Sequence, residues 1–138
     1  METEDRRFKA LDVLLDYSKG TLWWVKDRLW NEAIPGFVMK RKGHPGLSLS
    51  RRKSAGLYDL VPMAIGVTKT VKDGLAVRNI SEQSVSGKDR LTHFAVLRPC
   101  RIRFNDFGMA DGVSPNAYKP RLDRSESACL DKILFGGR

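Results

Sequence analysis

Apolar positions recur along the chain with two different periods, and the change from one to the other divides the sequence. Residues 3–17 follow the 3.6-residue period of an amphipathic helix, whose apolar face is formed by Phe8, Leu11, Leu14 and Leu15. From residue 21 onward, the alternation becomes that of strands. The pattern therefore predicts an N-terminal amphipathic helix as an extension over residues 1–18 and one main domain over residues 19–138.

Five to six short segments of the main domain have the composition or the alternation of strands. They are residues 21–26, 47–50, 58–68, 75–81 and 92–104, with residues 36–39 as a sixth candidate. In the second segment leucines alternate with serines, so Ser48 is expected on a polar face. In the last segment Arg101 and Arg103 alternate with apolar residues and are expected to point outward.

The connecting segments complete the predicted architecture. Residues 27–46 and 105–120 show no strand period and are expected to be loops, the second because it is rich in Gly, Pro, Asn and Asp. A short closing helix is expected from a Ser125 cap to a stop at Gly136. One helix, five to six strongly bent strands and one helix predict an α+β, mainly β fold built on a small bent sheet or barrel.

Charge is the strongest signal in the composition. Lys and Arg number 25 against 16 Asp and Glu, which gives a formal net charge of +9. This imbalance favours a polyanionic partner, most often nucleic acid, because each neutralised phosphate releases condensed counterions. A basic surface that only serves solubility is the other interpretation.

Several classes of protein are disfavoured by what the sequence lacks. No apolar run approaches the roughly 18–20 residues that a membrane span requires, and the amino terminus carries no secretory hydrophobic stretch. Two cysteines, Cys100 and Cys129, without CxxC spacing, predict neither a disulfide framework nor a zinc site. We therefore expect a soluble cytoplasmic protein with no membrane contact, no metal and no cofactor.

A basic segment surrounds the strand expected at residues 47–50. Its six cations are Lys40, Arg41, Lys42, Arg51, Arg52 and Lys53. Charges at the two ends of a strand are usually solvated. In a chain with this net charge, they could also contact a phosphate backbone.

The same region carries a resemblance to a known family. The stretch "GHPGLSLSRRKSAGLYDLVPMAIGVT" resembles the core of the PemK/MazF-type toxins, "KGTLWWVK" looks like their opening strand, and "RLDRSESACLDKILF" looks like their closing helix. The resemblance spans residues 19–135. It implies an SH3-like barrel, a homodimer, metal-independent cleavage of single-stranded RNA such as mRNA, and neutralisation by a cognate antitoxin.

The resemblance also implies site residues. His44 stands where the family has an arginine before the proline, and Thr68 matches the threonine that ends the apolar strand. A histidine with a pKa near 6.5 suits proton transfer, and a threonine hydroxyl can donate to a phosphate. Without the resemblance, His44 is an ordinary exposed loop histidine and Thr68 an ordinary strand-terminal residue. His93 follows the register of apolar neighbours and is expected in the core.

The expected RNA contacts are basic and aromatic. Besides the six cations of the basic segment they are Lys69, Arg98, Arg101 and Arg103. Trp30, in the expected loop, is the candidate for stacking on a base, whereas at least one of Trp23 and Trp24 is expected in the core.

Two other functions stay open. The chain could be a noncatalytic nucleic-acid-binding barrel, since the family's arginine is replaced at His44 and Arg98 is followed by no acid. It could also be a module whose groove receives an acidic peptide. The arrangement of serines gives no support to a serine hydrolase.

Overall fold

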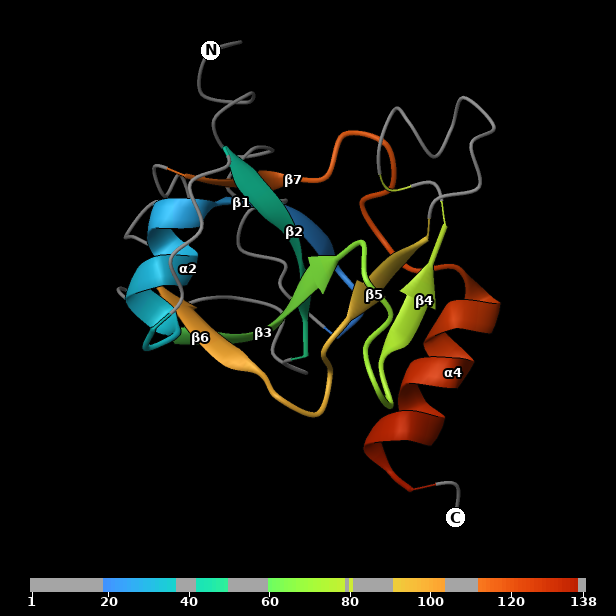
Figure 1. The fold of residues 1–138 in the computed structure, drawn as a ribbon. Coiled ribbons are helices and arrows are strands. Elements are labelled where there is room, and N and C mark those ends of the chain that lie inside the picture. Colours follow the sequence, from blue (N-terminus) through green and yellow to red (C-terminus); the bar gives the residue numbers. More distant parts are fainter. Residues whose placement is uncertain are drawn as a thin grey trace, which may run out of the picture.

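The fold was analysed in a computed structural model, which describes residues 19–36, 42–49, 60–78, 80, 91–103 and 112–136. Within these ranges the chain is α+β and mainly β, with seven strands and two helices (Figure 1). The expected helical extension over residues 1–18 lies outside the described part. In the described part, no helix is long and apolar enough to cross a membrane.

The strands form one antiparallel sheet in the order β4-β5-β3-β2-β1-β7, with β6 also beside β3. They are β1 (Leu22–Lys26), β2 (Gly43–Ser48), β3 (Leu60–Val67), β4 (Leu75–Val77), β5 (Thr92–Phe94), β6 (Cys100–Arg103) and β7 (Val113–Pro115). The first three strands form a meander, and β7 returns to the free edge of β1. Among the described strands β4 and β7 do not pair, so the sheet is open.

Strands β5 and β6 lie along the same edge of β3 and act as one interrupted strand. Gly66 pairs with Phe94, and Met63 pairs with Cys100. Three positions separate the two residues of β3, whereas six separate their partners, so the β5–β6 side carries three extra residues. These extra residues form a turn closed by a hydrogen bond from Arg98 N to Ala95 O at 3.1 Å.

The sheet is covered on both faces, by α2 (Asp27–Ala33) on one and by α4 (Arg124–Leu134) on the other (Figure 1). The alternation of β1 assigns its residues to two cores. Trp23 packs in the cluster that includes Trp30 of α2, and Leu22 packs in the cluster that includes Leu130 of α4. Both faces therefore bury apolar side chains, although the strands are short.

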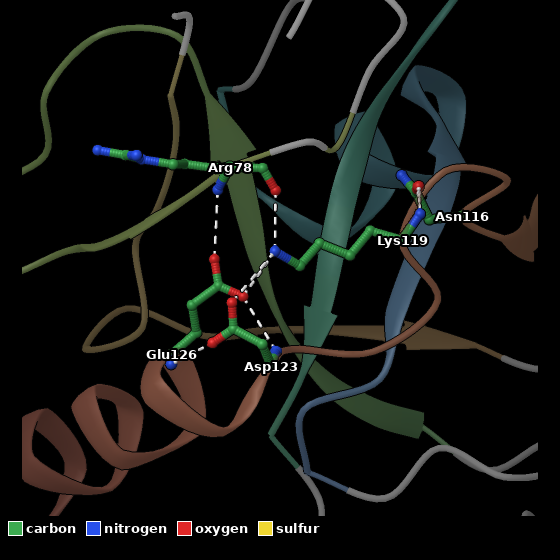
Figure 2. A network of polar contacts seen from close by, with 5 residues as sticks. All are labelled: Arg78, Asn116, Lys119, Asp123 and Glu126. Carbon is green, nitrogen blue, oxygen red and sulfur yellow. Dashed lines mark hydrogen bonds and ion pairs between the residues drawn. The ribbon is translucent and has the colours of Figure 1, made fainter. Parts of the chain in front are cut away.

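The start of α4 is fixed by a polar network that also reaches β4 (Figure 2). Asp123 caps the helix by accepting a hydrogen bond from Glu126 N at 2.8 Å, and Glu126 Oε1 accepts one from Asp123 N. Lys119 Nζ lies 2.7 Å from Glu126 Oε1 and donates to the carbonyl of Arg78 at 3.0 Å. Asn116 Oδ1 accepts from the backbone N–H groups of Tyr118 and of Lys119 itself.

Several sequence predictions about these elements are wrong. The expected loop over residues 27–46 contains α2 and the first part of β2, and the expected loop over residues 105–120 contains β7. The expected strand over residues 92–104 is divided into β5 and β6, so the described residues form seven strands. The sixth candidate, residues 36–39, lies outside the described part except for residue 36. Asp123, not Ser125, caps the closing helix. Ser48 is fully buried and its Oγ donates to Thr21 O, because both faces of β2 are covered.

Candidate functional site

The histidine that the sequence singled out lies in a buried pair. His44 is the second residue of β2, and its Nδ1 lies 2.5 Å from Oδ1 of Asp27, the first residue of α2. The two side chains are 9% and 4% exposed. The expectation of an exposed loop histidine is therefore wrong, because α2 folds back over the start of β2.

The helix is held in this position by Trp30. The indole Nε1 donates to the carbonyl of His44 at 3.3 Å, and the ring fits against Gly46, where an added Cβ would stand 3.2 Å from Cζ2. A seven-residue helix is marginal by itself, so burial of the tryptophan stabilises α2. Trp30 is fully buried and cannot stack on a base, which corrects the sequence prediction.

The pair has the arrangement by which a carboxylate orients an imidazole. Asp27 holds Nδ1, so the ring presents Nε2 on its opposite side. The second oxygen, Asp27 Oδ2, is buried and has no hydrogen-bond partner among the residues that the structure describes. A buried polar atom without a partner is costly, so its retention calls for an explanation, and a functional role is one of the explanations.

Thr68 lies at the same end of the β2–β3 pair as His44. The two strands are antiparallel and pair as far as Gly46↔Ile65, so the start of β2 and the end of β3 are neighbours. His44 precedes the last pair by two residues and Thr68 follows it by three. Thr68 and Lys69 are exposed.

A cavity of about 560 Å³ opens beside the end of β3 and the β5–β6 turn. Its apolar wall is formed by Ile65, Val67, Val71, Ala95 and Leu97. Three charged residues, Lys72, Asp73 and Arg98, complete the lining. In the described part of the chain, none of these three takes part in an ion pair.

A second, smaller cavity of about 170 Å³ lies between α2 and the edge formed by β3 and β6. Arg101 and Arg103 line it together with Glu32 and Leu60. Both arginines are exposed, which confirms their predicted outward direction.

The remaining predicted residues divide into three groups. Exposed cations are Lys42, Lys69, Arg98, Arg101 and Arg103. Outside the described residues lie Lys40, Arg41, Arg51, Arg52 and Lys53. His93 is half-buried and flanked by the buried Thr92 and Phe94, so its expected place in the core is wrong.

The described residues contain no cluster of three or more His, Cys, Asp and Glu side chains that could hold a metal ion. Comparison with protein-family models, with curated proteins and with solved structures finds no match for this chain.

The residue that the sequence left unnoticed is Asp27. Its one signal there is an acid directly after a strand, which is too common to single out a site.

Proposed function

We propose that this chain is a metal-independent endoribonuclease that cleaves single-stranded RNA, as the toxin component of a toxin–antitoxin pair. The observation that carries the proposal is the buried His44–Asp27 pair, with 2.5 Å between Nδ1 and Oδ1. The resemblance to the PemK/MazF-type toxins and the net charge of +9 support it.

The chemistry requires two proton transfers around one phosphate. The 2′-hydroxyl oxygen of a ribose attacks the adjacent phosphorus, the bond from phosphorus to the 5′ oxygen breaks, and a 2′,3′-cyclic phosphate remains. In this proposal Nε2 of His44 takes the 2′-hydroxyl proton, while Asp27 keeps the ring oriented and stabilises its protonated form. A solvent water donates a proton to the 5′ oxygen of the leaving strand, and the protonated His44 ring then returns its proton to solvent.

The charge that develops on the phosphate needs donors close by. Thr68 and Lys69 are exposed at the end of β3, on the same end of the sheet as the start of β2. Their hydroxyl and ammonium groups would donate to the phosphate oxygens. The exposed cations Lys42 and Arg98 would contact the flanking phosphates.

The proposal also covers fold type and partners. A meander β1-β2-β3 whose last strand returns to β1 is the strand order of a small SH3-like barrel. The described sheet is open, and pairing of its two end strands, β4 and β7, would close it into such a barrel. A homodimer and a cognate antitoxin that neutralises the chain follow from the resemblance alone, and a cytoplasmic location is the expectation drawn from the sequence.

A noncatalytic RNA-binding barrel is the second candidate, and one observation favours it. The His44 side chain is only 9% exposed, so its ring lies below the surface. In that case the pair with Asp27 would serve to attach α2 to β2, and the exposed cations would provide RNA affinity.

The test is incubation of the purified protein with a long single-stranded RNA in EDTA. Discrete fragments with 2′,3′-cyclic phosphate ends, formed by the wild type and strongly reduced for Thr68→Ala, are expected. Intact RNA that is retained in a salt-dependent manner would contradict cleavage and select the binding barrel.

A further inference from the structure

We infer that the cavity between the end of β3 and the β5–β6 turn is a nucleobase subsite that selects guanine in single-stranded RNA. This inference rests on the proposed function, because it names the substrate that the same end of the sheet receives. Nothing in the sequence pattern singles out Asp73, the residue that the inference makes decisive.

The cavity has the volume that a nucleotide needs, and its lining has an apolar part and a charged part. Its volume of about 560 Å³ falls in the range of roughly 300–1,000 Å³ that is common for small-molecule sites. One wall is apolar and includes Leu97, a residue that is 54% exposed. An exposed leucine facing a hollow offers a surface on which the flat face of a base can lie.

The two cations of the cavity suit the phosphate of the same nucleotide. Lys72 and Arg98 come from two different segments, the turn after β3 and the turn between β5 and β6. Among the described residues neither is engaged in an ion pair, so neither has to be released before it binds an anion. They also lie on segments adjoining Thr68 and the end of β3, where the proposed cleavage takes place.

Asp73 gives the cavity its preference among bases. An ionised carboxylate is an acceptor only, with two oxygens side by side. Guanine presents two adjacent donors, N1–H and N2–H, on its Watson–Crick edge, which is one of the two edges that proteins read in unpaired RNA. Adenine, cytosine and uracil each present a single donor group there, so only guanine can bind the carboxylate through both oxygens.

The backbone at Asp73 makes the residue suitable for a clean substitution. Its φ is +56°, in the left-handed region that Asn and Asp tolerate better than most residues. Asp73→Asn therefore keeps the turn and the shape of the side chain but replaces one acceptor oxygen by a donor. Asp73→Gly provides a second variant, because glycine adopts this φ without strain.

The experiment measures binding by fluorescence anisotropy with short 2′-O-methyl oligouridines that carry G, A, C or U at one central position. The 2′-O-methyl group blocks the proposed cleavage, so binding is measured whether or not the chain is a nuclease. The wild type is expected to bind the G-containing oligonucleotide at least about fivefold more tightly, as a bidentate contact to a base typically gives. Asp73→Asn and Asp73→Gly are expected to lose this preference.

Glu32→Gln is the matched control. Glu32 lines the other cavity, and its substitution raises the net charge by one, as Asp73→Asn does. The control is expected to keep the preference for G. Arg98→Gln is expected to weaken binding of all four oligonucleotides alike and to reduce the dependence of affinity on salt.

Equal affinity of the wild type for the four oligonucleotides would overturn the inference, and so would a preference for G that survives in Asp73→Asn and Asp73→Gly. A preference for G that depends on Asp73, in a protein that cuts no RNA, would keep the subsite and reject the nuclease. RNA cleavage without any preference that depends on Asp73 would keep the nuclease and reject the guanine subsite.

Discussion

The Phe94 ring lies in the space that a side chain on Gly66 would occupy. The two residues pair across β3 and β5, and an added Cβ at position 66 would stand 2.7 Å from Cε1 of Phe94. Phe94 is fully buried in the core beneath α4. Glycine therefore allows β5 to come close to β3 at the point where the candidate site begins.

Gly66→Ala is predicted to destabilise the fold. The added methyl group would also meet Thr92 and Pro45 within 2.9 Å, so side chains or backbone must shift. Overpacking of this kind costs about 1–3 kcal/mol. Urea unfolding followed by circular dichroism measures the loss in the free energy of unfolding, and wild-type stability in the variant would contradict the packing described here.

Phe94→Leu tests whether the Phe94 ring is the group that a side chain at position 66 would meet. The smaller side chain leaves room for the added methyl group, so the double variant is expected to lose less stability than the two single variants together, by about 0.5 kcal/mol or more. Strict additivity would show that the ring is not what opposes a side chain at position 66.

The segments with a clear alternation were predictable from the sequence. The alternation of 58–68 predicts one face formed by Val61, Met63, Ile65 and Val67. The first three lie in one core, whereas Val67 is only half-buried. The alternation of 100–103 placed its arginines outward correctly. The sequence also predicts an edge or a bulge at Pro62, because proline has no N–H to donate to a neighbouring strand. This is wrong for the strand as a whole, since β3 lies in the interior of the sheet, and the carbonyl of Pro62 accepts a hydrogen bond from Leu49 N just after β2 ends.

The errors share one cause, which is that distant contacts decide the structure of short segments. Helix α2 has too few residues to show a period, and it depends on Trp30 packing against Gly46. Asp27 becomes notable only because α2 brings it to His44, 17 residues away in the sequence. Neither relationship has a local signal, so the sequence could offer His44 as a candidate but could not point to Asp27 beside it.

Trp24 is predicted to be the tryptophan that a soluble quencher reaches. Of the three tryptophans in the chain, Trp23 and Trp30 are fully buried, whereas Trp24 is 41% exposed. Acrylamide should therefore quench one component of the intrinsic fluorescence, and this component should be absent in Trp24→Phe. Undiminished quenching in the variant would mean that a second tryptophan is accessible.

The two cysteines are predicted to react at very different rates. Burial raises the pKa of the Cys100 thiol to about 11, and its Sγ lies 3.3 Å from the carbonyl of Met63. At pH 8 only about one thiol in a thousand is then the reactive thiolate. Iodoacetamide followed by mass spectrometry should modify the exposed Cys129 first, and Cys129→Ser should stay unmodified until denaturant is added. Rapid modification of Cys100 in the folded variant would contradict its burial.

The cap of α4 is predicted to give a pH-dependent contribution to stability. The hydrogen bond from Glu126 N, with Lys119 nearby, holds the pKa of Asp123 below its ordinary value of 3.8. Its charged form therefore stabilises the fold above about pH 4, and this contribution is lost as the pH falls through the lower folded pKa.

Asp123→Ala should lower the free energy of unfolding by about 1 kcal/mol at pH 7, the usual effect of removing an N-cap. The difference from wild type should narrow in acid. Asp123→Asn should retain most of the stability, because asparagine caps nearly as well. The measurement is thermal unfolding of the three proteins at pH 7 and pH 3. A stability difference between wild type and Asp123→Ala that is larger at pH 3 than at pH 7 would contradict the prediction.

The central claim is that His44, oriented by Asp27, transfers protons in metal-free RNA cleavage. The most direct measurement is the single-turnover cleavage rate of a defined RNA in EDTA for wild type, His44→Gln and Asp27→Asn, each checked for folding by circular dichroism. The account predicts a loss of about 10²–10⁴-fold for His44→Gln, the usual contribution of general acid–base catalysis, and a substantial loss for Asp27→Asn. Cleavage at the wild-type rate by a folded His44→Gln variant would contradict it.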